Sequence, residues 1–232
     1  MTYKMRVAGC VVSLSLCLTA ACGSGEESTP APTARVYTTN FSLDENPIAE
    51  SGNWVNGQVV GLDWQNVRTM TGLAFGTQTG SNNLDDSIAL LTGAWQPDQT
   101  VEATVYTVNQ SASITEEVEL RLRSSLSQNK CTGYEVLFNV RGGVQIFRWN
   151  GPLGDYVLLP GGGAASPILK TGDVVKATIV GDTITAYLNG TQVLQASDPT
   201  PFQSGSPGMG FFLRGTSGVN ADYGFTRFTA SE

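Results

Sequence analysis

The sequence contains no histidine among its 232 residues, so its chemistry is limited to carboxylates, tyrosines, lysines and arginines. This absence excludes Ser-His-Asp and Cys-His nucleophile arrangements, HExxH zinc sites and an imidazole general base. The sequence also has no GxxxxGK[ST] loop, no GxSxG elbow and no CxxC pair. The remaining candidates are a concentration of basic side chains, two neighbouring glutamates and several acids.

Basic residues are concentrated between positions 121 and 148, where Glu135 is the only acid. If neighbouring strands align there, one outer sheet face gathers Arg121, Arg123, Asn139, Arg141 and Arg148. Guanidinium groups bind carboxylate and sulfate groups through paired hydrogen bonds, so this face is expected to bind an acidic polysaccharide. The alternative is a solvated face whose arginines pair across strands with Glu119 and Glu135.

Glu117 and Glu119 alternate along one predicted strand and therefore share a face. A retaining glycoside hydrolase needs two carboxyl groups about 5–5.5 Å apart, one as nucleophile and one as acid/base. Acids on a solvated strand have the same spacing. The pair therefore leaves both hydrolysis and an ordinary polar face open.

The chain around these candidates alternates with period two in short runs rich in Val, Ile, Thr, Tyr and Phe. The clear runs are 100–108, 117–126, 133–141, 144–150, 174–180, 183–189 and 222–229. No window sustains an amphipathic helix. About a dozen strands in one Gly-rich domain predict an all-β fold, a two-sheet antiparallel jelly-roll sandwich.

Tight turns predict how three of these strands pair. Gly142-Gly143 is interpreted as a two-residue hairpin turn that places Arg141 opposite Val144. In that register Phe147 and Trp149 point into the core, and Trp149 is a core residue rather than a platform for sugars. A hairpin at Gly181-Asp182 pairs Val180 with Thr183, and the following turn at Asn189-Gly190 requires a bulge.

The first 21 residues resemble a bacterial lipoprotein signal peptide, with Lys4 and Arg6 before a short apolar stretch that ends at Cys22. Cys22 is expected to take the lipid, with palmitate among its acyl chains, and to anchor the protein to a membrane. The alternative is an ordinary secretion signal that contains a cysteine. Residues 22–35 are rich in Ser, Pro, Gly and Glu, which predicts a flexible tether.

Removal of residues 1–21 would change the net charge from −7 to −9, because the segment holds two basic residues and no acid. This acidity argues against nucleic acid as a partner. It would also leave Cys131 as the one cysteine besides Cys22, so we expect no internal disulfide and a buried Cys131 thiol.

Several segments resemble concanavalin A-like lectin/glucanase domains, and within them the laminin-G-like type of bacterial extracellular proteins. They are DENPIAESGNW (44–54), GYEVLFNVRGGVQIFRWNG (133–151), LKTGDVVKATIVGDTITAYLNGTQV (169–193) and ADYGFTRF (221–228). The resemblance covers most of 36–232 and implies a jelly roll whose concave face often binds glycans. It does not imply an enzyme.

The resemblance also suggests two enzymatic alternatives. Hydrolases of the superfamily carry an ExDxE type of motif on one strand, and here Arg121 stands where the third acid is expected after Glu117 and Glu119. Some lyases of this fold use a tyrosine as base and acid, a role that Tyr187 could take with Lys176, Arg141 and Asn139. Most similar lyases also carry a catalytic histidine, which this sequence lacks.

A structural calcium ion is a further possibility, because similar domains sometimes hold one and calcium prefers hard oxygen ligands. Candidate ligands are Asp85 and Asp86 in one loop, and Asp44 with Asp222, at chain ends that meet in similar domains. Runs of Asn, Asp and Gly are also typical of simple turns.

Together these observations predict a lipid-anchored protein of the bacterial cell envelope whose domain binds a polysaccharide or cell-surface glycan without catalysis. The alternatives are a polysaccharide lyase, a glycoside hydrolase and a protein-binding adhesion or envelope module.

Overall fold

The computed structural model describes residue 2, residues 34–81, residue 84 and residues 86–232. Apart from residue 2, the predicted signal peptide lies outside the described residues, as do Cys22, the tether up to residue 33 and Asp85. Ala34–Glu232 forms one unit with its own core. Arg35, the last residue of the predicted tether, donates hydrogen bonds to the carbonyls of Thr92 and Ala94, each at 3.0 Å.

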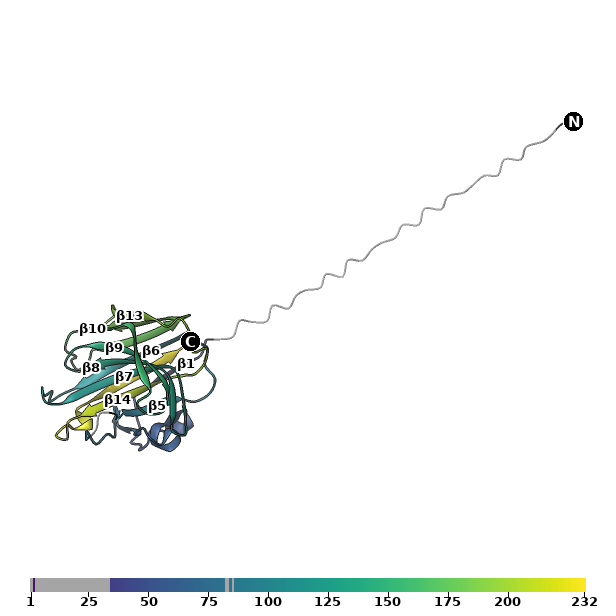
Figure 1. Ribbon diagram of the computed structural model, residues 1–232. Helices are drawn as coiled ribbons and strands as arrows, with labels where there is room; N and C mark the ends of the chain where they lie inside the picture. The colour runs from purple at the N-terminus through teal and green to yellow at the C-terminus, as the bar shows by residue number, and fades with distance from the viewer. Residues whose placement is uncertain (1, 3–33, 82–83, 85) are drawn as a thin grey trace. The chain divides into compact units, whose positions relative to one another are not determined.

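Two antiparallel sheets pack face to face, as predicted (Figure 1). In the first, β1 pairs with β15, and the strands in spatial order are β13 (Thr191–Ser197), β12 (Thr183–Leu188), β11 (Val174–Val180), β6 (Gln99–Thr107), β15 (Tyr223–Ser231), β4 (Leu73–Gly76) and β3 (Val67–Met70), with β1 at Val36–Thr39. We call this the eight-stranded sheet.

The second, seven-stranded sheet carries the candidate site. Its strands in spatial order are β10 (Tyr156–Ala164), β9 (Val144–Gly151), β8 (Lys130–Asn139), β7 (Thr115–Ser127), β14 (Ser206–Arg214), β5 (Asp86–Leu91) and β2 (Trp54–Asn56). The helices of the described residues are single turns: η1 (Glu50–Gly52), η2 (Gly57–Gly61) and η3 (Asn220–Asp222).

The core lies between the sheets and follows the period-two pattern of the sequence. In β7, Val118, Leu120 and Leu122 are completely buried and point inward, while Glu117, Glu119 and Arg121 point to the outer side. Burial of each large side chain contributes roughly 1.5–3 kcal/mol. The core therefore fixes which side of each strand faces outward.

The predicted register of the hairpin at Gly142-Gly143 is wrong by three residues. Phe138, not Arg141, lies opposite Val144. The turn begins at Asn139, whose carbonyl accepts a hydrogen bond from the Gly142 amide at 2.9 Å, and Gly142 has a φ of +103°. This is a longer turn that needs glycine after its tightest bend. Because three is odd, every side chain of β9 changes face.

The other two turns are as predicted. Val180 lies opposite Thr183, and the pairing continues to Val175 opposite Leu188. A register shift between Ala186 and Tyr187 supplies the expected bulge before the turn at Asn189-Gly190.

A second, smaller core lies on the outer side of the seven-stranded sheet. It consists of Trp64, Ile88, Leu90, Cys131 and Trp149. Gly61 lets the η2 segment pack closely against β7, because a Cβ at position 61 would lie 2.9 Å from a methyl group of Leu126 on that strand. Cys131 is free and buried as predicted, and burial raises the pKa of its thiol to about 12. The outer side of this sheet is therefore partly covered rather than fully solvated.

Candidate functional site

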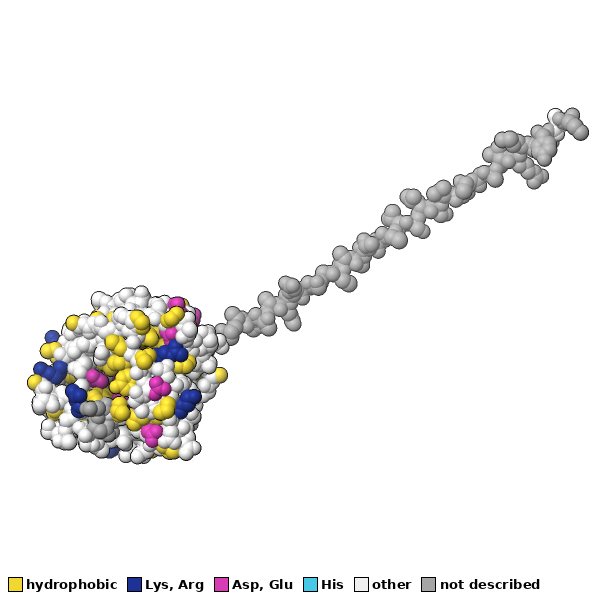
Figure 2. Space-filling view, in the orientation of Figure 1, with side chains coloured by type: hydrophobic (Ala, Val, Ile, Leu, Met, Phe, Trp, Pro, Cys, Tyr) yellow, Lys and Arg dark blue, Asp and Glu magenta, His cyan; other side chains and the backbone are white. Residues whose placement is uncertain are grey.

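A groove runs over the outer side of the seven-stranded sheet, next to the second core. It consists of two adjoining cavities of about 360 and 440 Å³ that share Glu117, Leu137 and Gln145. Figure 2 shows this face hollowed, with hydrophobic side chains in the hollow and acidic side chains beside them. The first cavity is also lined by Leu84, Asp86, Thr115, Glu135, Phe147, Trp149, Tyr156, Phe212 and Arg214. The second has a glycine-rich wall that includes Asn139, Gly142, Gly143 and Gly163.

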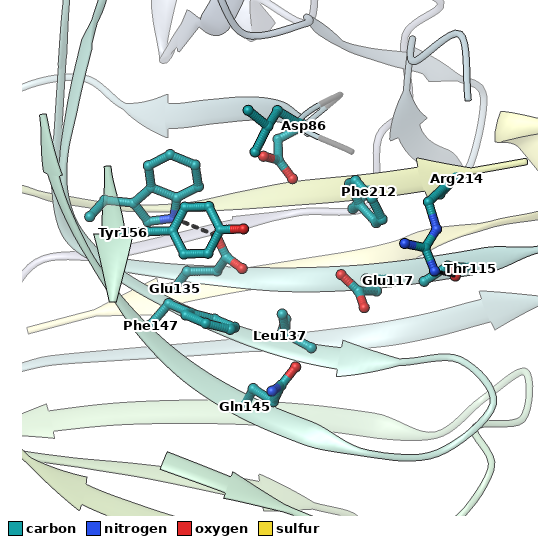
Figure 3. Close-up of a pocket in the computed structure, with 12 residues that line it drawn as sticks. Asp86, Thr115, Glu117, Glu135, Leu137, Gln145, Phe147, Tyr156, Phe212 and Arg214 are labelled. Carbon is teal, nitrogen blue, oxygen red and sulfur yellow. Dashed lines mark hydrogen bonds between the residues drawn. The ribbon is translucent and has the colours of Figure 1, made fainter. Parts of the chain in front are cut away.

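Aromatic side chains form one end of the first cavity (Figure 3). Tyr156 on β10 pairs with Trp149 on β9, and its ring lies 5.3 Å from Phe147 and 4.9 Å from Trp149. Tyr156 is 39% exposed. The expectation that Phe147 and Trp149 belong to the core between the sheets is thus wrong: Trp149 is buried, but in the second core, and Phe147 lines the groove.

Carboxyl groups occupy the middle of the groove. Figure 3 shows Asp86, Glu117 and Glu135 projecting into the first cavity from β5, β7 and β8. Glu117 accepts a hydrogen bond from Asn139 Nδ2 at 3.2 Å. Desolvation inside the groove and the nearby Glu135 carboxylate raise the pKa of Glu117 to about 7. Glu117 can therefore exchange a proton near neutral pH.

Arg121 lies beneath the groove and is completely buried. Its guanidinium forms ion pairs with Glu119 and, at 2.9 Å, with Glu135, which also accepts a hydrogen bond from Trp149 Nε1 at 2.6 Å. A Cβ at position 210 on β14 would overlap the Glu119 carboxylate, so glycine there makes room for the pair. The prediction that Arg121 faces a ligand is wrong, because two glutamates and the second core enclose it.

The other arginines of the predicted cationic face are dispersed. Arg123 lies in a bulge of β7 with a φ of +44° and donates hydrogen bonds to the carbonyls of Pro97 and Phe202. Arg148 pairs with Asp198 at 2.5 Å and lies over the Phe202 ring.

Arg141 is exposed on the hairpin turn, so a continuous cationic face does not form. Among the residues predicted to form that face, Asn139 lines the second cavity. The odd register shift explains the position of Arg148, and the bulge explains that of Arg123.

Lys176 and Tyr187 lie on the eight-stranded sheet, away from the groove. They face each other across β11 and β12, with the Lys176 ammonium 4.4 Å from the centre of the Tyr187 ring. The structure thus separates the predicted ligand-binding residues onto two sheets. The lyase alternative based on Tyr187, Arg141 and Asn139 has no common site.

The predicted calcium ligands that lie among the described residues, Asp44, Asp86 and Asp222, do not gather. Asp44 accepts hydrogen bonds from the Thr71 amide and hydroxyl, whereas Asp222 accepts one from Asn109 Nδ2 at 3.1 Å. Asp86 lines the groove. The described part of the chain holds no group of three or more His, Cys, Asp or Glu side chains arranged to bind a metal ion.

Several residues that line the groove were not among the candidates predicted from the sequence, including Gln145, Phe147, Tyr156, Phe212 and Arg214. The signal for the first two was present in the Asn-x-x-Gly pattern at 139–142, which favours a turn beginning at Asn. Choosing that turn over Gly142-Gly143 places Gln145 and Phe147 outside.

No family model and no curated protein sequence matches this chain. Solved structures do match. A carbohydrate-binding module, CBM66 from Bacillus subtilis, is similar with a TM-score of 0.52 and 17% identity over 78% of this chain and 92% of that one. β-Agarase A in complex with oligoagarose has a TM-score of 0.57 and 8% identity over 86% and 93%.

The potassium-bound carbohydrate recognition domain of Emp46p has a TM-score of 0.52 and 12% identity over 83% of this chain and 94% of that one. These likenesses show that the chain has the concanavalin A-like jelly-roll sandwich fold. The laminin-G-like type stays a prediction. In the described residues, no helix has the length and apolar character needed to span a membrane.

Proposed function

We propose that this domain binds carbohydrate in the groove of the seven-stranded sheet. The observation that carries the proposal is the exposed ring of Tyr156, with Phe147 beside it, next to the polar groups of Gln145 and Glu117. A sugar ring has an apolar C–H face and an edge of hydroxyl groups. Aromatic rings pack against the first, while amide and carboxylate oxygens accept hydrogen bonds from the second.

The fold supports the proposal, because the similar structures include a carbohydrate-binding module and a carbohydrate recognition domain. The sequence-based hypothesis of an acidic polysaccharide is not carried forward. The arginines of the predicted cationic face are buried or dispersed, and carboxylates occupy the groove instead.

A glycan array followed by calorimetry tests this function. We expect the wild-type domain to bind a glycan and Tyr156→Ala to weaken it by at least about tenfold, equivalent to ~1.4 kcal/mol. Tyr187→Ala is the matched control, because it removes a tyrosine from the other sheet. Absence of binding to every glycan of the array, together with co-purification of an envelope protein, would instead support the adhesion alternative.

Glycoside hydrolysis is a second candidate, favoured by one observation. Glu117 and Glu135 line the same cavity and interact electrostatically, and the pKa of Glu117 is raised to about 7. A carboxylic acid that holds its proton near neutral pH can protonate a leaving group, while a neighbouring carboxylate acts as nucleophile or base. These two acids come from adjacent strands, not from the Glu117 and Glu119 pair predicted from the sequence.

Release of reducing ends from the glycan bound on the array separates the two functions. Hydrolysis predicts new reducing ends with the wild-type domain and none with Glu117→Gln. Binding without any product supports a lectin-like function.

We further propose that Cys22 carries a lipid that anchors the protein to a membrane of the bacterial cell envelope, outside the cytoplasm. The support is the sequence of residues 1–22 alone. Metabolic labelling with an alkyne-bearing fatty acid is expected to label the wild-type protein. Cys22→Ser should abolish both the label and recovery in the membrane fraction, and a labelled variant would contradict the anchor.

A further inference from the structure

Glu117 is the starting point of the inference, because it lines both cavities. Its carboxyl group is desolvated and receives a hydrogen bond from Asn139 Nδ2, but it belongs to none of the ion pairs of the described residues. A desolvated carboxylate without a cation is unfavourable and takes up either a proton or a positive partner. The groove therefore has a place for a positive charge.

The charged groups around Glu117 strengthen this demand. Glu135 on β8 raises the pKa of Glu117, and Arg214 on β14 lowers it less. Glu119, two residues along β7, is buried with Oε1 lacking a hydrogen-bond partner, and burial with Glu135 raises its pKa well above the usual range. Asp86 on β5 and Tyr156 on β10 line the same cavity.

The nearby cations do not balance these acids. Arg121 is enclosed between Glu119 and Glu135. Arg214 lies at the end of the cavity away from Tyr156 (Figure 3), where it donates to Thr115 Oγ1 at 3.5 Å. Three carboxyl groups (Glu117, Glu119 and Glu135) thus accompany two guanidinium groups, an excess of one negative charge if all ionise.

We propose that the groove recognises a glycan with free amino groups, a hexosamine polymer, whose ammonium group binds the Glu117 carboxylate. This inference rests on the proposed function. The aromatic rings pack against the sugar ring inside the cavity. The carboxylates favour a positively charged substituent on that ring. An ammonium donates charge-assisted hydrogen bonds, which are about twice as strong as those of a neutral hydroxyl. A uronate or sulfate would meet like charges and is excluded.

The test compares glycans of one backbone and linkage that differ in a single substituent. Suitable β-1,4 tetrasaccharides are those of glucosamine, N-acetylglucosamine, glucose and glucuronate, titrated into the full domain at about pH 7, where the amine and the Glu117 carboxyl group are both partly charged. We expect the glucosamine tetramer to bind at least about tenfold tighter than the glucose tetramer. The glucuronate tetramer should not bind.

Glu117→Gln should weaken binding of the glucosamine tetramer at least about tenfold more than binding of the glucose tetramer, so that the preference for the amino sugar is lost. Glu102→Gln, the same charge change at an exposed position of the eight-stranded sheet, should keep the preference. Equal binding of the amino and neutral tetramers by the wild-type domain overturns this inference and leaves glycan binding standing. Absence of binding to all four, and to every glycan of the array, overturns both.

Discussion

The outer sides of the two sheets differ although both come from alternating polar and apolar residues. On the eight-stranded sheet, Lys176 and Tyr187 pair across neighbouring strands at the surface. On the seven-stranded sheet, the outward residues Glu119 and Arg121 are completely buried. The difference arises because the η2 segment and Trp149 cover part of the second sheet. Alternation predicts which side a residue faces, but not whether water reaches it.

The largest expected difference between the two sides is in the energy of their charged contacts. Arg121→Ala leaves Glu119 and Glu135 buried beside each other without a cation, so we expect a loss of about 3–5 kcal/mol in the free energy of unfolding. Lys176→Ala on the other sheet removes the cation–π contact with Tyr187 and should lose no more than about 1 kcal/mol. Urea denaturation measures both, and a similar loss for the two variants would remove the distinction.

Gly210→Ala is expected to have the next largest effect. A Cβ there overlaps the Glu119 carboxylate and approaches Arg121 Nε, and overpacking of this kind costs about 1–3 kcal/mol. Gly163→Ala on β10 is the matched control, since its Cβ would come no closer than 3.9 Å to a neighbouring side chain. Thermal unfolding that shifts equally for both variants would contradict the packing described for Gly210.

The pH dependence of stability should also distinguish the groove. The pKa of Glu117 is about 7 in the folded domain against 4.5 for an ordinary glutamate, so the folded state binds more protons between these values. Its contribution to stability is therefore complete below about pH 4.5 and is lost as pH rises through about 7. Glu116, whose pKa burial also raises to about 7, adds to the same slope.

We expect the melting temperature to fall between about pH 5 and pH 8, and Glu117→Gln to flatten part of that fall. Glu102→Gln, on the eight-stranded sheet, should leave the slope unchanged. A slope identical in Glu117→Gln and the wild type would show that Glu117 titrates normally.

The smallest expected effect concerns the turn that sets the groove. Gly142 has a φ of +103°, which a residue with a side chain adopts with strain, so Gly142→Ala should lose about 1–2 kcal/mol. Gly163→Ala again serves as the control. Full stability of Gly142→Ala would argue against the turn that begins at Asn139.

Sequence reasoning predicted the sandwich and the Gly181-Asp182 hairpin because local turn chemistry and alternation agreed there. It failed at Gly142-Gly143, where two turns were compatible with the same residues. The Asn139 turn places Phe138 opposite Val144 and satisfies the amide of Arg141 through the Asn139 side chain. The choice between the turns decides the face of Phe147, and with it the composition of the groove.

Burial of the arginines could not be predicted from the same information. Arg121 becomes inaccessible because Trp64, distant in sequence, packs against Trp149 on the outer side of the sheet with ring centres 5.8 Å apart. Arg148 is held by Asp198, fifty positions away. Such partners follow from tertiary packing, and no local pattern in 121–148 indicates them.

Nuclear magnetic resonance with the best glycan of the array tests most directly that the groove is the binding site. The account predicts that titration shifts the backbone amide signals of Gln145, Phe147 and Gly163, while those of Lys176 and Tyr187 stay fixed. Shifts confined to Lys176, Tyr187 and their neighbours on the eight-stranded sheet would contradict it.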